Sequence, residues 1–325
     1  MKRLERLLAT LFMLSWSSIL SAVQVPGPLV ETDWLDKHQG EVVILDVRKD
    51  TKSFTEGPVF KTDKKTGKRQ LEKTGGHIPG AVLVNYKHVH AARAIEGEKV
   101  THLIPEKADF ENLMRKSGVN RDSAVVIVIE GKDNEDLTMA TRLYWELKYY
   151  GHDNMSILNG GLAQWLVDGK KIVMTAAEPS TGNWQATAER GAILAGTADV
   201  MGAMQTGSAQ LVDNRSLGEY LGIRKKTTVH ANGHIPGARV FPGELMGSER
   251  LPAKFLPADE LRQLLQAMHI RDQAATITYC NSGQTASEGW FILSELLGNR
   301  DVRLYDASMQ EWTLKKLPVN TMKME

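Results

Sequence analysis

The stretch AATITYCNSGQTASEGWFILSELLG, residues 274–298, decides the fold. Its first six residues are mostly apolar or β-branched, which predicts a strand over 274–279. After a short polar loop, apolar residues recur at helical spacing from Ser287 and stop at Gly298, which predicts a helix. A short apolar run of this kind suits a strand that is buried on both faces. We therefore expect a parallel sheet covered by helices.

The same alternation of strand-like and helix-like segments occurs twice in the chain of 325 residues. Four blocks recur in the same order: VVILDVR at 42–48 with QLVDNR at 210–215, GGHIPGAVLVN at 75–85 with NGHIPGARVFP at 232–242, EKADFENLMRKSGVNRDSAVVIVI at 106–129 with PADELRQLLQAMHIRDQAATITY at 257–279, and YYGHDNMSILNGGLAQW at 149–165 with LLGNRDVRLYDASMQEW at 296–312. Ordered repetition of this kind indicates two copies of one domain. The spacing between matching residues drifts because loops of different length join a shared core.

We place one α/β domain at 24–172 and a second at 193–325. Each is expected to hold a mainly parallel sheet with helices on both faces. The segment 173–192 between them is polar and contains Pro and Gly, as a linker does. In sheets of this type, ligands bind at the carboxyl ends of the strands.

The first 22 residues, MKRLERLLATLFMLSWSSILSA, have a basic start, an apolar run and small residues at Ser21 and Ala22. This layout predicts a secretory signal peptide over 1–22 that is cleaved after Ala22. The alternative is a membrane anchor, but the apolar run is short and serines interrupt it. We expect an exported protein, periplasmic in a Gram-negative bacterium, with no membrane anchor after cleavage.

Charge and cysteine content narrow the function classes. The 40 Lys and Arg residues nearly balance the 39 Asp and Glu residues, so nothing favours a nucleic-acid partner. Cys280 is the one cysteine and cannot form an intramolecular disulfide. A lone thiol in an oxidising compartment is a liability unless it is buried or used. Cys280 is therefore either a nucleophile or a small buried apolar residue.

The position of Cys280 favours the nucleophile. It ends a predicted strand, and the loop behind it opens into the N-terminus of a predicted helix. Backbone N–H groups in such a loop, together with the helix dipole, favour a thiolate over a thiol. Gly283 permits a tight backbone, and the hydroxyls of Ser282 and Thr285 can donate inward. The predicted anion-binding loop comprises Asn281, Ser282, Gly283, Gln284, Thr285 and Ala286.

The repeat provides an internal comparison for this loop. Aligning the halves on Asp122 and Asp272 places Cys280 opposite Glu130. The corresponding loop of the first half is rich in carboxylates, namely Glu130, Asp133, Glu135 and Asp136. Carboxylates would repel a thiolate or an anionic substrate. We therefore predict that the first domain is inactive and the second is catalytic.

LDVR, GHIPGA and the loop CNSGQTA, in two copies with the cysteine only in the second, resemble the tandem rhodanese-domain sulfurtransferases. The resemblance covers nearly the whole mature chain. It implies that Cys280 takes a sulfane sulfur from a donor such as thiosulfate or 3-mercaptopyruvate and holds it as a persulfide. A thiophilic acceptor, cyanide or a thiol, then removes the sulfur. The resemblance implies these small partners and no cofactor.

The donor preference is open from the sequence. Relatives that prefer mercaptopyruvate use a Ser in the loop and a His of the first HIPG motif as a proton relay. Ser282 and His77 match those positions, with Asp63 as a third member. Those relatives also carry an Arg where this chain has Glu219. The nearby basic residues that could replace its charge are Arg224, Lys225 and Lys226.

Two other groups of residues have structural explanations. Asp46 with Arg48, and Asp213 with Arg215, are expected to form ion pairs at strand ends rather than catalytic groups. His88 and His90 are two residues apart, but a zinc site needs a third ligand that the sequence nearby does not supply. We predict no metal site.

Two other functions are compatible with parts of this pattern. A cysteine phosphatase of related fold needs a longer loop closed by an Arg that clamps phosphate. Here Ala286 ends the loop and the next Arg is Arg300, which argues against a phosphatase. The second rival is a non-catalytic rhodanese module that carries sulfur or binds a partner, and the intact cysteine loop does not exclude a carrier.

Overall fold

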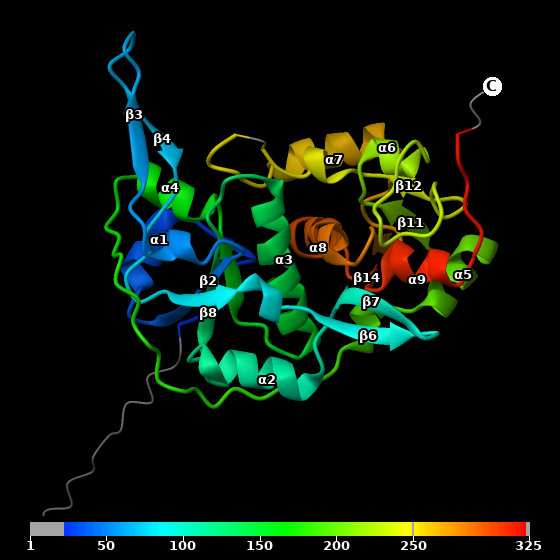
Figure 1. The fold of residues 1–325 in the computed structure, drawn as a ribbon, viewed down its shortest axis with the longest axis horizontal. Helices are drawn as coiled ribbons and strands as arrows, with labels where there is room; N and C mark the ends of the chain where they lie inside the picture. Colours follow the sequence, from blue (N-terminus) through cyan, green and yellow to red (C-terminus); the bar gives the residue numbers. More distant parts are fainter. Residues whose placement is uncertain (1–22, 249, 323–325) are drawn as a thin grey trace, which may run out of the picture.

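The computed structural model describes residues 23–248 and 250–322 (Figure 1). The predicted signal peptide lies outside these residues. Two five-stranded parallel sheets follow one another along the chain. The order of the first sheet is β1 (Leu29–Val30), β9 (Met155–Leu158), β8 (Ala124–Val128), β2 (Val42–Arg48) and β5 (Val82–Asn85). The order of the second is β10 (Leu194–Ala195), β14 (Val302–Tyr305), β13 (Thr276–Tyr279), β11 (Gln210–Asp213) and β12 (Arg239–Val240).

The two sheets have the same topology, which confirms the predicted repeat of one α/β domain. The helices of the first domain are α1 (Thr32–His38), α2 (Lys107–Lys116), α3 (Asn134–Tyr149) and α4 (Gly161–Val167). Those of the second are α5 (Thr197–Thr206), α6 (Leu217–Tyr220), α7 (Ala258–Ala267), α8 (Gln284–Phe291) and α9 (Ser308–Leu314). One π-helical turn, Ile292–Leu296, continues α8.

Alternating side chains of the central strands face two different cores. In β8, Val125 and Ile127 belong to one buried cluster, while Val126 and Val128 belong to another together with residues of α1 and α4. All four side chains are fully buried. This arrangement explains why the strand sequences are continuously apolar rather than alternating.

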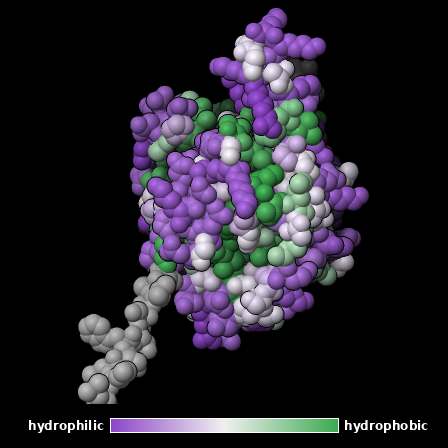
Figure 2. All heavy atoms as spheres, turned by 90° about the vertical axis from the view of Figure 1, so that its left-hand side faces the viewer, coloured by the Kyte–Doolittle hydropathy of each residue, from purple (hydrophilic) through white to green (hydrophobic). Residues whose placement is uncertain are grey.

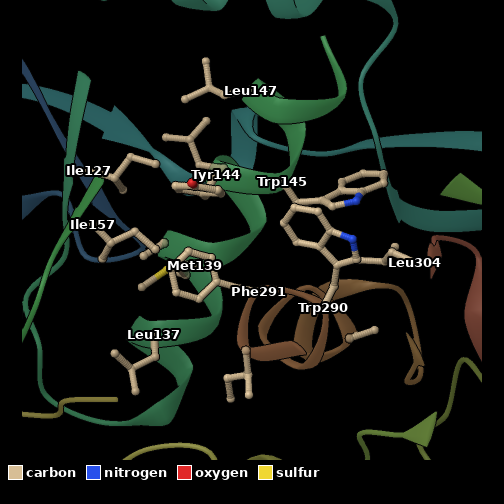
Figure 3. Close-up of a cluster of buried hydrophobic side chains, with 14 of the residues drawn as sticks. Ile127, Leu137, Met139, Tyr144, Trp145, Leu147, Ile157, Trp290, Phe291 and Leu304 are labelled. Carbon is tan, nitrogen blue, oxygen red and sulfur yellow. The ribbon is translucent and has the colours of Figure 1, made fainter. Parts of the chain in front are cut away.

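The helices α3 and α8 lie side by side in the middle of the molecule and join the domains (Figure 1). Figure 3 shows their side chains meeting, with Trp290 and Phe291 of α8 close to Tyr144 and Trp145 of α3. The rings of Tyr144 and Phe291 make an edge-to-face contact with centroids 4.9 Å apart. One buried apolar cluster therefore spans both domains.

Two hairpins extend from the first domain. The hairpin β3 (Val59–Thr62) and β4 (Arg69–Lys73) projects away from the body and is mostly hydrophilic (Figures 1 and 2). The hairpin β6 (Ala91–Ile95) and β7 (Glu98–Leu103) instead reaches the second domain, where Val100 and Leu103 join a core cluster with Trp312.

The predicted linker 173–192 is held along the first domain. Trp184 is buried, and its indole Nε1–H donates to His152 Nδ1 at 3.2 Å. The backbone N–H of Gly182 donates to the Arg115 carbonyl at 2.8 Å. The segment therefore covers the end of α2 as it crosses to the second domain.

Candidate active site

Cys280 follows β13 directly and borders a cavity of about 750 Å³ between the two domains. The residue is 3% exposed, so the thiol meets the cavity but is shielded from bulk solvent. The walls of the second domain come from segments around Asn214, Lys226 and Gly243. The first domain adds the N-terminus of α3 and His102.

The hydroxyl of Ser308 holds the backbone of the cysteine loop. It accepts hydrogen bonds from the N–H groups of Cys280 at 3.0 Å and Gly283 at 3.1 Å. It donates to the Tyr305 carbonyl at 2.7 Å. The side chain is fully buried, so all three bonds are shielded from water. Ser308 therefore fixes both ends of the turn that carries the thiol.

The backbone of Ser308 is left-handed, with φ of 51°, which is uncommon for a residue with a side chain. The equivalent residue of the first domain is Gly161, with φ of 55°. A Cβ atom there would collide with the Ile129 carbonyl. Sequence reasoning missed Ser308, although the repeat DASMQEW against NGGLAQW displays this Gly-to-Ser difference.

The helix behind the loop starts earlier than predicted. It begins at Gln284 rather than Ser287, with Gly283 as its N-cap at φ of 74°. The turn thus shortens to Asn281–Gly283, and Gln284, Thr285 and Ala286 form the first helical turn. A Cβ atom on Gly283 would collide with the Asp306 carbonyl, so only glycine fits. The first-turn N–H groups lack helical partners.

Arg142, a buried arginine of the first domain, contacts the cysteine loop. Arg142 Nη1 of α3 donates to Asp306 Oδ1 at 2.7 Å and to the Gly283 carbonyl at 3.4 Å. Its Nε donates to Glu146 Oε1 at 2.8 Å. The N–H of Ile104 donates to the other Asp306 oxygen at 2.8 Å. Burial raises the pKa of Glu146 to about 8.

The family described as Rhodanese-like domain matches residues 31–168 and 197–315. The chain belongs to this family. SseA from Mycobacterium leprae, provisionally named a thiosulfate sulfurtransferase, is 31% identical and covers 91% of both chains. The sulfur carrier protein TtuD of Thermus thermophilus is 29% identical over 88% of this chain and 94% of its own length. The crystal structure of SseA from Escherichia coli, described as a 3-mercaptopyruvate sulfotransferase, superposes with a TM-score of 0.66 at 26% identity, covering 87% of this chain and 98% of that chain.

The register of the two rhodanese sheets corrects the alignment of their cysteine loops. Asp46 pairs with Val128, and its counterpart Asp213 pairs with Tyr279. Cys280 therefore corresponds to Ile129, and Glu130 corresponds to Asn281. The alignment on Asp122 and Asp272 assumes an offset of 150 residues and is wrong by one. The first residues of α2 and α7, Lys107 and Ala258, are already 151 positions apart.

The first rhodanese loop is built around carboxylates. Glu130 is buried, accepts from Thr74 Oγ1 at 2.9 Å and forms an ion pair with Lys132 at 2.7 Å. Asp133 caps α3 by accepting from the Asp136 N–H at 3.1 Å. The loop thus has Ile129 in place of a thiol. Its own carboxylates, rather than a bound anion, interact with the N-terminus of α3.

His77 does not reach the cavity of the cysteine. Its ring stacks on Phe54 with centroids 3.6 Å apart, and its Nδ1 is bonded to the Phe54 carbonyl at 2.8 Å. His234 of the second domain does the same with Tyr220, at 3.8 Å and 2.7 Å. Both histidines therefore fasten the HIPG turn to the preceding segment. The relay with Ser282 is not assembled, and Asp63 lies in the projecting hairpin, where it accepts from the N–H groups of its own turn.

The basic run reaches the cavity only through its last member. Lys226 lines the cavity with Ser282 and Glu219. Arg224 instead donates to Ser216 Oγ at 3.2 Å, and Lys225 donates to the Val229 carbonyl at 2.7 Å. The prediction that Arg224 and Lys225 contact substrate therefore has no support in this geometry.

The strand-end ion pairs are structural, as the sequence indicated. Arg48 binds Asp46 at 2.7 Å and the Gly76 carbonyl at 2.7 Å. Arg215 binds Asp213 at 2.6 Å and the Gly233 carbonyl at 2.8 Å. Each pair ties a sheet strand to its HIPG turn, and both arginines are buried.

His102 is a second site residue that the sequence did not reveal. It lines the cavity from the β6–β7 hairpin with a left-handed backbone at φ of 64°. Its Nδ1 is bonded to Thr101 Oγ1 at 2.9 Å, and the Thr101 N–H donates to Gln310 Oε1 at 3.0 Å. Burial and the nearby Arg142 charge lower the pKa of His102, so its ring is neutral at pH 7.

Across residues 23–248 and 250–322, no helix is long and apolar enough to cross a membrane.

Proposed function

We propose that this sulfurtransferase works through a persulfide on Cys280. The supporting observation is a single thiol at the N-terminus of α8, in a turn fixed by Ser308, on the wall of a cavity between the domains. The other rhodanese domain has Ile129 at this position, so one site per chain carries the chemistry.

In the first half-reaction, the Cys280 thiolate attacks the outer sulfur of a donor such as thiosulfate or 3-mercaptopyruvate. A bond forms between Sγ and that sulfur, and the donor leaves with the electron pair of the broken bond, as sulfite or as the pyruvate enolate. In the second half-reaction, cyanide or a thiolate attacks the outer sulfur, and the electron pair returns to Cys280. No cofactor enters either step.

The turn stabilises the charge that both half-reactions place on sulfur. The N–H groups of Gln284 and Thr285, in the first turn of α8, have no partner within the helix. They and the helix dipole favour a negative charge at the end of the Cys280 side chain. Because Ser308 occupies the N–H groups of Cys280 and Gly283, it fixes the turn without blocking those of the helix.

A sulfur carrier is the second candidate function. It is supported by the name of the Thermus thermophilus relative, a sulfur carrier protein. A carrier would form the same persulfide but would release sulfur only to a specific partner. The two functions therefore differ in turnover with small acceptors and not in the chemistry of Cys280.

The test follows sulfur from thiosulfate and from 3-mercaptopyruvate to cyanide in the purified protein, with Cys280→Ser as the comparison. We expect turnover by the wild type and none by the variant. The double variant Cys280→Ser with Ile129→Cys is the matched control, and it should stay inactive because Glu130 follows the new thiol. A sulfur adduct on Cys280 without turnover would favour the carrier, and no adduct with either donor would overturn both functions.

A further inference from the structure

The cavity beside Cys280 carries more negative than positive side chains. Four carboxylates line it, from Asp133, Glu135, Glu219 and Glu244, against the cations of Arg215 and Lys226. Arg215 is already paired with Asp213 at 2.6 Å, and Lys49 pairs with Glu135 at the rim. His102 is neutral at pH 7 because its pKa is lowered. A small dianion would therefore enter a cavity of like charge.

Glu219 is the lining carboxylate that contacts the residue directly after Cys280. It is 7% exposed, whereas Asp133, Glu135 and Glu244 are on the surface. Its Oε1 accepts from Asn281 Nδ2, the residue after the nucleophile, at 2.9 Å, and its Oε2 accepts from Ser216 Oγ at 2.8 Å. Both donors are uncharged and hold the carboxylate in one orientation. The Arg215 cation acts on Glu219 through space, but its ion pair is with Asp213.

The first domain shows that the fold does not need a charge at this position. Ser53 precedes Phe54 there, as Glu219 precedes Tyr220, and Phe54 and Tyr220 hold the two HIPG histidines alike. Ser53 Oγ accepts from Arg48 Nη1 at 3.0 Å. In the second domain Glu219 turns to Asn281 instead, and the buried Nη1 of Arg215 is left without a protein partner.

The cavity is also larger than thiosulfate, an anion of five atoms, would occupy. Cavities of roughly 300–1,000 Å³ hold organic ligands of many atoms, and this one measures about 750 Å³. Volume and charge together favour an organic substrate with a positive group over thiosulfate.

We propose that the sulfur acceptor is an organic thiol with a cationic group, which Glu219 binds while the thiol attacks the Cys280 persulfide. This rests on the proposed function, because it describes the second half-reaction of the same site. The acceptor thiolate forms a bond with the outer sulfur, and the bond from that sulfur to Sγ breaks. The electron pair returns to Cys280 as a thiolate, and the acceptor leaves as its persulfide.

The test isolates the second half-reaction. The protein is loaded with sulfur from inorganic polysulfide, and the decay of the Cys280 persulfide is followed with three acceptors: cysteamine, which is cationic, 2-mercaptoethanol, which is neutral, and 3-mercaptopropionate, which is anionic. Each rate constant is compared between wild type and Glu219→Gln, so differences in thiol reactivity among the acceptors cancel. Glu178→Gln, on the exposed linker segment, is the matched control for loss of one carboxylate.

We expect Glu219→Gln to slow transfer to cysteamine by about tenfold and to leave 2-mercaptoethanol nearly unchanged. Transfer to 3-mercaptopropionate should rise, and Glu219→Arg should raise it further. Glu178→Gln should change none of the three.

An equal effect of Glu219→Gln on all three acceptors would overturn the inference and leave the proposed function standing. A wild-type protein that forms no persulfide on Cys280 would overturn the proposed function, and the inference with it.

Discussion

At the scale of single residues, Ser308 fixes the turn that carries Cys280. Its hydroxyl accepts two loop N–H groups at 3.0 and 3.1 Å while its own backbone lies in the left-handed region. The hydrogen bonds stabilise the turn, and the backbone conformation costs roughly 1–2 kcal/mol for any residue other than glycine. The backbone of Ser308 is therefore strained, and its hydroxyl fixes the position of the thiol.

The substitutions Ser308→Ala and Ser308→Gly separate these two effects. Both leave the buried N–H groups of Cys280 and Gly283 without an acceptor, so both should lower sulfur transfer strongly. Only glycine relieves the backbone, so Ser308→Gly should be more stable than Ser308→Ala by about 1 kcal/mol in urea unfolding. Equal stability of the two variants would contradict the assignment of strain to this backbone.

Glu288 predicts a pH dependence of stability. Burial raises its pKa to about 8, and its Oε2 accepts from Asn134 and Thr138 of the other domain. The unfolded chain loses this proton near pH 4.5 but the folded protein holds it until about pH 8, so stability falls as pH rises between these values.

Glu288→Gln should remove that dependence, because an amide has the same shape and stays uncharged. As pH rises from 5.5 to 8, we expect the stability of the variant relative to wild type in urea unfolding to increase by roughly 3 kcal/mol. A gain that does not change with pH would show that Glu288 titrates normally in the folded state.

At the scale of elements, α3 of the first domain supports the catalytic loop of the second through Arg142. Replacing Arg142 with Met leaves the Asp306 carboxylate buried without its cation. Loss of one partner from a buried ion pair costs about 3–5 kcal/mol. Arg142→Met should therefore unfold at much lower urea concentration, while Arg142→Lys, which keeps the charge, should lose less. Equal losses would mean that the charge of Arg142 is not what matters.

The strand before Cys280 and the turn and helix after it could be predicted from the sequence because each depends on neighbours along the chain. The start of α8 was placed late because polar Gln284 and Thr285 look like loop residues, although they occupy the first helical turn. Their polar side chains face the cavity, which periodicity cannot reveal.

The partners of the loop could not be predicted, because they come from far along the chain. Arg142 and His102 precede Cys280 by more than a hundred residues. Only when the domains dock does Arg142 contact the loop and His102 line the same cavity. His77 shared a motif with the family relay, but nothing local showed that its ring would stack on Phe54. Contacts between the domains depend on tertiary packing, which local sequence patterns do not predict.

For the whole molecule, the shared core predicts that the two domains unfold together. Trp290 and Phe291 of α8 are fully buried against the cluster that includes Tyr144 and Trp145 of α3. Separating the domains would expose this apolar surface, so calorimetry should show one transition, and residues 193–325 alone should be insoluble. Two resolved transitions, or a soluble and folded second half, would show that the domains are independent.

We also propose that the protein acts after export, as residues 1–22 suggest. When the full chain is expressed in a Gram-negative host, the mature protein should be recovered from the periplasm and begin at Val23. A deletion of residues 1–22 should leave the protein in the cytoplasm with unchanged sulfur transfer. Recovery of full-length protein that keeps Met1 would contradict the proposal.

The first domain has Ile129 at the position of Cys280, yet it contributes His102 and the start of α3 to the cavity wall. The thiol and part of the wall of the proposed substrate cavity thus belong to separate halves of one chain. Changes along that wall can alter which acceptor is admitted while the cysteine turn stays intact. An engineer seeking new acceptors would do well to randomise the wall residues of the half without the cysteine first.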